Sequence, residues 1–123
     1  MASQEDVRRI ALGLADVTQD GLSYRVDGKL IAWPWLERLD PKKARVANPD
    51  VLVVRVASEL DKHALIELEP AVFFTEPHFD GWPMVLIRLK AIEEPLLVKL
   101  LADSYALAKA KPKRRSRATG SQR

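Results

Sequence analysis

A histidine and an aspartate stand two residues apart in the segment FFTEPHFDGWPMVLIRL, residues 73–89. A carboxylate at that spacing can orient an imidazole as a general base, and Glu76 adds a further oxygen for a metal ion. Neither chemistry has its partners, because no nucleophile accompanies His78 and no His-x-x-x-His pair or acidic cluster accompanies Asp80. We therefore expect a protein that is not an enzyme, with no metal site and no cofactor.

The same segment suits a demanding turn between two strands. Pro77 keeps the residue before it extended, and Gly81 permits a backbone conformation that other residues avoid. Pro83 fits the first residue of a strand. We interpret Pro77, His78, Gly81 and Pro83 as a structural motif.

The totals limit the class of protein. The chain has 123 residues, of which 47% are hydrophobic, and this suffices for one domain with a modest core. The absence of cysteine excludes disulfides and Cys-based zinc sites, and it fits a reducing compartment. No signal-peptide pattern and no apolar run of about 20 residues is present. We expect a cytoplasmic protein without a membrane partner.

Positive charge is concentrated at the C-terminal end. Of the 20 lysines and arginines, six lie in residues 111–123, which hold no acid. Residues 1–110 therefore hold 14 basic residues and all 17 acidic residues. Such a segment cannot bury a core, and we predict a folded domain at 1–110 and a disordered basic tail at 111–123. The tail either neutralises phosphates without reading sequence or only improves solubility. Its clustered cations are Lys111, Lys113, Arg114, Arg115 and Arg117.

Hydrophobic periodicity predicts three helices and five strands. Helices are expected at residues 4–15, 59–68 and 93–110. Strands are expected at residues 22–26, 29–35, 51–57, 72–75 and 83–89, with a loop at 37–50. Asp27-Gly28 is typical of a tight hairpin turn. The order α-β-β-β-α-β-β-α predicts a two-layer α+β sandwich, in which all three helices bury their apolar stripes on one face of a mostly antiparallel sheet.

The second and third helices each carry an apolar stripe. In the second, Leu60, Ala64 and Leu68 share one face, and His63 lies away from it as a surface residue. In the third, the buried stripe is Leu97, Leu100, Leu101, Ser104, Tyr105 and Ala108, where the small Ser104 allows close approach.

The chain resembles the MmcQ/YjbR family of small bacterial proteins. The resemblance covers residues 4–108 and rests on EDVRRIALGL, VDGKLIA and above all PHFDGWP at 77–83 followed by Arg88-Leu89. It implies a frataxin-like fold, a proposed role in DNA binding through wing-like hairpins, and no catalytic residues. The acidic ridge of frataxin is missing, because Glu5 and Asp6 stand beside Arg8 and Arg9, so iron binding is not expected.

Basic residues mark two candidate DNA-binding surfaces. Strand alternation places Arg25, Arg55 and Arg88 on the sheet face away from the helices, where Lys29 and two tryptophans would join them. Arginines among exposed aromatic residues suit contacts with phosphates and bases. The expected loop at 37–50 adds a possible basic wing of Arg38, Lys42, Lys43 and Arg45.

Both surfaces have alternatives. Each sheet arginine would be an ordinary surface residue if it paired with an acid such as Glu37 or Glu69, and the loop cations would be ordinary too. The leading hypothesis is a non-enzymatic DNA-binding protein. The alternative is a module that binds a protein or a small ligand through Trp33, Trp35 and Trp82.

Overall fold

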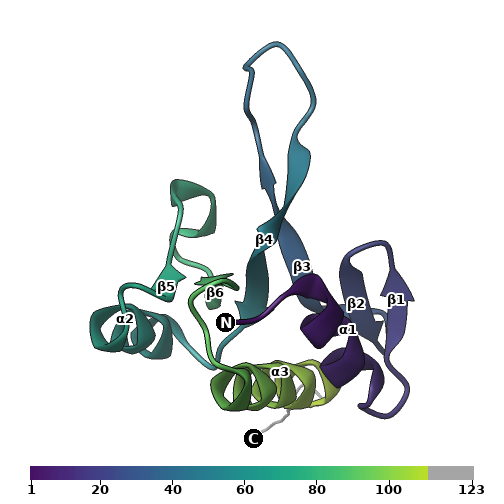
Figure 1. The fold of residues 1–123 in the computed structure, drawn as a ribbon. Coiled ribbons are helices and arrows are strands. Elements are labelled where there is room, and N and C mark those ends of the chain that lie inside the picture. The colour runs from purple at the N-terminus through teal and green to yellow at the C-terminus, as the bar shows by residue number, and fades with distance from the viewer. Residues whose placement is uncertain (111–123) are drawn as a thin grey trace, which may run out of the picture.

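The computed structural model describes residues 1–110 and places helices on and beside one six-stranded sheet (Figure 1). The strands are β1 (Thr18–Asp20), β2 (Ser23–Val26), β3 (Lys29–Glu37), β4 (Val46–Arg55), β5 (Phe73–Phe74) and β6 (Met84–Arg88). The helices are α1 (Gln4–Leu12), α2 (Glu59–Leu68) and α3 (Glu94–Lys109), with a 3₁₀ turn η1 (Pro77–Phe79). The sheet order is β1-β2-β3-β4-β6-β5, and every neighbouring pair is antiparallel. The predicted α+β sandwich is confirmed, with β1 as a strand that the sequence did not indicate.

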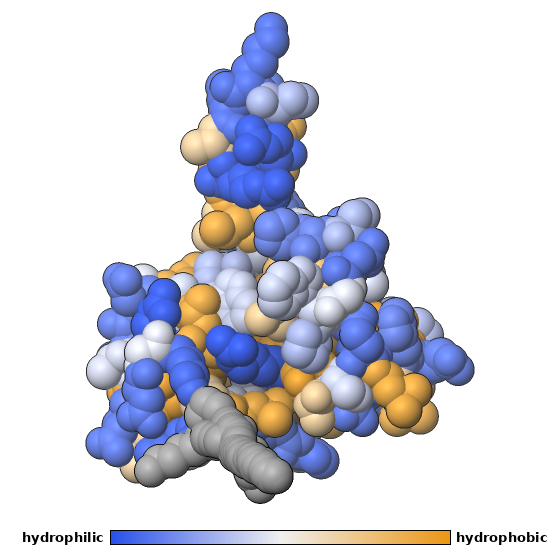
Figure 2. Space-filling model, turned by 180° about the vertical axis from the view of Figure 1, so that it is seen from behind, coloured by the Kyte–Doolittle hydropathy of each residue, from blue (hydrophilic) through white to orange (hydrophobic). Residues whose placement is uncertain are grey.

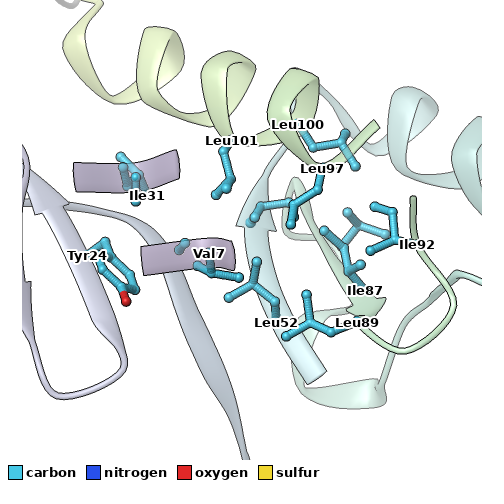
Figure 3. Close-up of a cluster of buried hydrophobic side chains, with 14 of the residues drawn as sticks. Val7, Tyr24, Ile31, Leu52, Ile87, Leu89, Ile92, Leu97, Leu100 and Leu101 are labelled. Atoms are coloured by element: carbon cyan, nitrogen blue, oxygen red, sulfur yellow. The ribbon is translucent and has the colours of Figure 1, made fainter. Parts of the chain in front are cut away.

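The core lies between the sheet and the helices α1 and α3. Val7 of α1 and Leu97 and Leu101 of α3 are fully buried together with Leu52 of β4 and Ile87 of β6 (Figure 3). These side chains point toward one another from elements far apart in the sequence. Within residues 1–110, no helix is long and apolar enough to cross a membrane.

Ser104 joins α3 to the sheet by hydrogen bonds as well as by close packing. Its hydroxyl donates to the Ile31 carbonyl at 2.6 Å and accepts from the backbone N–H of Arg55 at 3.0 Å. The bond to Ile31 is made where β3 carries an irregularity, because the register against β2 shifts between Tyr24 and Arg25. A buried hydroxyl thus satisfies backbone groups on two strands.

Turn residues behave largely as their types predict. Asp27 and Gly28 have φ angles of 53° and 79°, which is the conformation that the β2–β3 hairpin requires. Pro34 cannot donate to a strand ladder, and the register of β3 against β4 shifts directly after it, between Pro34 and Trp35.

The expected loop at residues 37–50 is wrong, because both of its ends are strand. Beyond the bulge, β3 and β4 continue to pair through Trp35 with Asn48, Leu36 with Ala47 and Glu37 with Val46. This extension, residues 35–48, projects from the body as a two-stranded arm (Figure 1). Most of its residues are exposed, so no alternation of apolar and polar residues reveals it in the sequence.

The predicted burial of Leu60, Ala64 and Leu68 is also wrong. Helix α2 lies at the β5 edge of the sheet (Figure 1), where Leu60 and Leu68 are each 78% exposed. The stripe that α2 turns inward is instead Lys62, Leu65 and Ile66. A lysine within that stripe hides it from hydrophobic patterning, which selects the more apolar but outward stripe.

Two leucine substitutions test this reversal. Leu101→Ala removes a fully buried side chain and should lower the free energy of unfolding by about 2–5 kcal/mol. Leu68→Ala should change it by less than about 0.5 kcal/mol, because that side chain lies at the surface. Urea unfolding of both variants measures the difference, and equal losses would contradict the placement of α2.

Candidate nucleic-acid interface

The tip of the arm is a tight turn that its own side chains stabilise. The backbone N–H of Lys43 donates to the Asp40 carbonyl at 3.0 Å, and the Asp40 carboxylate accepts the N–H of Lys42 at 2.9 Å. The Arg38 guanidinium crosses the turn to the carbonyls of Pro41 and Lys43, at 3.2 and 3.0 Å. Pro41 fits the second position of such a turn. The tip is therefore built to hold one shape.

Cations dominate the surface of this arm. Arg38, Lys42, Lys43 and Arg45 are all exposed, and Figure 2 shows the arm as largely hydrophilic. Its two acids are already engaged, because Asp40 accepts a backbone N–H and Glu37 accepts the Asn48 amide at 2.8 Å. Within residues 1–110, none of these four cations forms an ion pair. The Arg45 guanidinium donates to the Leu36 carbonyl at 3.1 Å, and this bond holds the side chain at the base of the arm.

Strand alternation sets the three predicted arginines on the sheet face away from α1 and α3, although Arg55, at the end of β4, also lines a hollow between α2 and α3. Arg25 lies opposite Leu30 in the β2–β3 register, Arg55 opposite Met84 and Arg88 opposite Val51 in the β4–β6 register. Each guanidinium donates to a backbone carbonyl: Arg25 to Gly28, Arg55 to Leu30 and Arg88 to Pro70. Arg25 and Arg55 thus both approach the end of β3 that begins with the exposed Lys29.

The proposed pairing of these arginines with acids is wrong for the part of the chain that the structure describes. None of the three lies within ion-pair distance of a carboxylate there. Arg88 instead stacks on the ring of Phe74, with its guanidinium carbon 4.2 Å from the ring centroid. A guanidinium has five N–H donors and each spends one on a carbonyl, so most donors remain for phosphate oxygens.

Between the base of the arm and η1 lies an aromatic hollow of about 100 Å³, lined by Trp33, Pro34, Trp35, Leu36, Arg45, His78 and Phe79. The centroid of the Trp35 ring lies 5.9 Å from that of the His78 ring and 5.5 Å from that of the Phe79 ring. Asp80 is not part of the lining, so the hollow does not bring His78 and Asp80 together as a base and its orienting acid. Within residues 1–110, no three His, Asp or Glu side chains gather as metal ligands.

A buried lysine fixes the wall of the hollow that His78 and Phe79 provide. Lys62 of α2 is 1% exposed, and its ammonium donates to the carbonyls of Phe79 at 2.8 Å and Trp82 at 3.0 Å. The same ammonium lies 2.8 Å from a carboxylate oxygen of Glu59. Sequence reasoning missed Lys62, because a lysine in a helix is read as a surface residue.

The motif residues around this lysine adopt a turn of the expected kind. Pro77 begins η1, and Gly81 has a φ of 81°. The Pro83 carbonyl accepts the N–H of Val56, and β6 begins at the next residue. Trp82 is 59% exposed and does not line the aromatic hollow, so the three tryptophans do not form one surface.

A larger hollow of about 570 Å³, also unanticipated from the sequence, lies between α2 and α3. Its lining is mostly apolar and includes Leu65, Leu68, Leu100 and Leu107. The predicted tail cations Lys111, Lys113, Arg114, Arg115 and Arg117 lie outside the described residues.

Relatives of the chain are bacterial. It is 40% identical over 114 residues to "Uncharacterized protein Rv2570" of Mycobacterium tuberculosis, an alignment that covers 87% of this chain and 88% of that protein. "Uncharacterized protein Mb2600" of Mycobacterium bovis matches with the same values. No family model and no solved structure matches the chain.

Replacing the buried lysine should loosen the aromatic wall. Lys62→Met leaves two carbonyls and the Glu59 carboxylate without their cation, and we expect a loss of about 3–5 kcal/mol in the free energy of unfolding. Lys99→Met is the control, because Lys99 forms an exposed pair with Asp103 and should cost less than about 1 kcal/mol. Urea titrations compare the two, and equal small losses would overturn the role of Lys62.

The Glu59–Lys62 contact also predicts a pH dependence. The hydrogen bond from Lys62 holds the pKa of Glu59 below its ordinary value of 4.5. A lowered pKa in the folded state adds stability that is complete above the unfolded-state pKa and is lost as the pH falls through the folded-state pKa. The stability gap between the native chain and Glu59→Gln should therefore shrink below pH 4.5. Urea unfolding across pH measures this gap, with the exposed Glu67→Gln as control.

Proposed function

The chain belongs to the same family as these mycobacterial proteins, and from its own residues we propose that it is a non-enzymatic DNA-binding protein whose arm docks in a groove of the duplex. The observation that carries the proposal is the arm itself. It exposes four cations, and both of its acids are occupied by hydrogen bonds within the arm.

Shape and charge of the arm both suit DNA. A two-stranded β-ribbon fits the major groove, which is about 12 Å wide. The arm is such a ribbon, and its turn presents Lys42 and Lys43 beyond the end of both strands. Lysines at that position reach phosphates on either side of a groove, which gives affinity without sequence preference.

The arginines of the sheet face would extend this contact. Arg25, Arg55 and Arg88 have no carboxylate partner within residues 1–110, and each is steadied by a backbone carbonyl. Cations held in place lose little side-chain freedom on binding, so more of the contact energy contributes to affinity. In this proposal the arm enters the groove and the arginines contact the phosphate backbone beside it.

We also propose that the protein is of the MmcQ/YjbR type, with a frataxin-like arrangement. The support for this lies in the PHFDGWP turn at residues 77–83 and in the wing-like projection of the β3–β4 hairpin.

A second candidate is a module that binds a small planar ligand or a protein segment at the tryptophans. The observation in its favour is the hollow that Trp33 and Trp35 share. Such a module should show a ligand-dependent change of tryptophan fluorescence that added salt does not abolish, whereas DNA binding weakens steeply with salt.

Removing the two lysines at the tip tests the DNA-binding proposal. In the full chain, Lys42→Ala with Lys43→Ala should make the slope of log affinity against log salt shallower by about 1 to 2, because each phosphate that a cation neutralises contributes about 0.9 to that slope. Fluorescence anisotropy with a labelled 20-base-pair duplex over a salt series measures the slope.

The matched control removes two lysines elsewhere. Lys90→Ala with Lys99→Ala takes the same charge from sites that pair with Asp50 and Asp103, and should leave the slope nearly unchanged. A second variant replaces Lys113, Arg114 and Arg115 of the tail with glutamine. If only this variant weakens binding, the arm is not the interface. If the native chain shows no salt-sensitive binding at all, the DNA-binding proposal is refuted.

A further inference from the structure

We propose that the aromatic hollow at the base of the arm receives a single unpaired nucleobase, so that the protein prefers duplex DNA with one unpaired nucleotide. This inference rests on the proposed DNA binding and adds a specificity to it. The hollow is lined by Trp33, Trp35, His78 and Phe79, with Arg45 among them.

The rings supply the surface that a base requires. Trp35 packs edge-on to His78 at 5.9 Å and tilted to Phe79 at 5.5 Å, and His78 meets Phe79 at 4.9 Å, also edge-on. Rings that meet at such angles leave faces unstacked, and a planar base stacks on an aromatic face whatever its sequence. His78 is exposed, and both tryptophans are half-buried, so the rings are reachable from solvent.

The size of the hollow favours one base over a pair. At about 100 Å³ the hollow is of the size of one planar ring system rather than of a base pair. A paired base is held inside its helix and would have to leave it, which costs energy that an unpaired base does not require. The natural occupant is therefore a base that already lacks a partner.

Position ties the hollow to the arm. Arg45 belongs both to the cations of the arm and to the lining of the hollow, and its bond to the Leu36 carbonyl holds it at their junction. A strand that follows the arm brings its phosphate to Arg45 as the attached base reaches the rings. A guanidinium beside aromatic faces serves both the phosphate and the base.

The hollow is preformed, which raises affinity by lowering the cost of ordering. Phe79 is buried against Val53 and Leu86, and its carbonyl is held by Lys62 at 2.8 Å. Trp33 and Trp35 lie on a strand that pairs on both sides of the bulge. The walls therefore come from two elements that are each anchored separately.

The experiment compares three labelled DNAs with the full chain at one salt concentration. One is a fully paired 20-base-pair duplex, one carries a single-thymidine bulge, and one carries an abasic residue at the bulge. The abasic probe keeps the backbone and its distortion and removes only the base. We expect the thymidine bulge to bind about 5- to 100-fold more tightly than the abasic bulge, which is the range of base–aromatic stacking.

Variants locate the preference. Trp35→Leu should bring the two bulged probes to equal affinity, and His78→Ala should reduce their ratio, because His78 is exposed and its loss spares the core. In a Trp82→Phe background, the fluorescence of Trp33 and Trp35 should be quenched by the thymidine bulge and not by the abasic one. Binding of the paired duplex should stay unchanged in His78→Ala, because His78 lies outside the arm.

The outcomes separate a failure of the base site from a failure of the DNA-binding proposal. Equal affinity of the native chain for the thymidine and abasic bulges, or an absence of binding to all three probes, overturns the hollow as a base site. If the paired duplex still binds while the bulges do not differ, only the hollow fails and the DNA-binding proposal survives. The native-chain comparison does not depend on whether Trp35→Leu folds.

Discussion

The ammonium of Lys62 joins helix α2 to the turn that forms one wall of the aromatic hollow. It is a buried charge, tolerated because two carbonyls and the Glu59 carboxylate surround it. Those carbonyls belong to Phe79 of η1 and to Trp82 in the turn that follows, so one side chain fixes α2 to the segment that carries His78 and Phe79. This contact adds to the backbone hydrogen bonds within the turn and to the packing of Phe79. The aromatic hollow therefore owes its second wall to a residue on a helix that hardly contributes to the main core.

The arm shows how the chain divides its cations between structure and surface. Arg38 and Arg45 spend donors on carbonyls of the arm, while Asp40 closes the turn and Glu37 holds Asn48. Neither acid forms an ion pair with a cation of the arm within residues 1–110, and the four cations outnumber the two acids, so Lys42 and Lys43 leave net positive charge at the tip. A planar guanidinium bridges several carbonyls well, and a lysine on a flexible stem adapts to phosphates at varied positions. The division follows the geometry of each side chain.

Much of the fold could be predicted from local pattern, because Asp27-Gly28, the stripe on α3 and the alternation of β6 act over a few residues. The failures involve contacts between distant residues. Lys62 is buried only because the turn at 77–83 supplies carbonyls, and this arrangement made α2 turn its more apolar stripe outward. The strands of the arm were not predicted, because exposed strands have no buried face and therefore no alternation of apolar and polar residues. For the site, strand alternation placed Arg25, Arg55 and Arg88 on one face, but the grouping of Trp33, Trp35, His78 and Arg45 depends on the sheet order and the bulge at Pro34.

The charge of the body decides how DNA could approach it. Residues 1–110 carry 14 basic and 17 acidic residues, so the domain as a whole repels a polyanion. The helices that cover the other face of the sheet carry charges of both signs, and Arg9 of α1 pairs there with Asp6 and with Glu94. The unpaired arginines and the arm lie on the opposite side. A duplex would therefore be attracted to the arm rather than to the helical layer, where charges of both signs occur, and this asymmetry orients it before contact. Because the arm and the hollow share Arg45, a duplex oriented in this way meets the groove-binding and base-binding elements together.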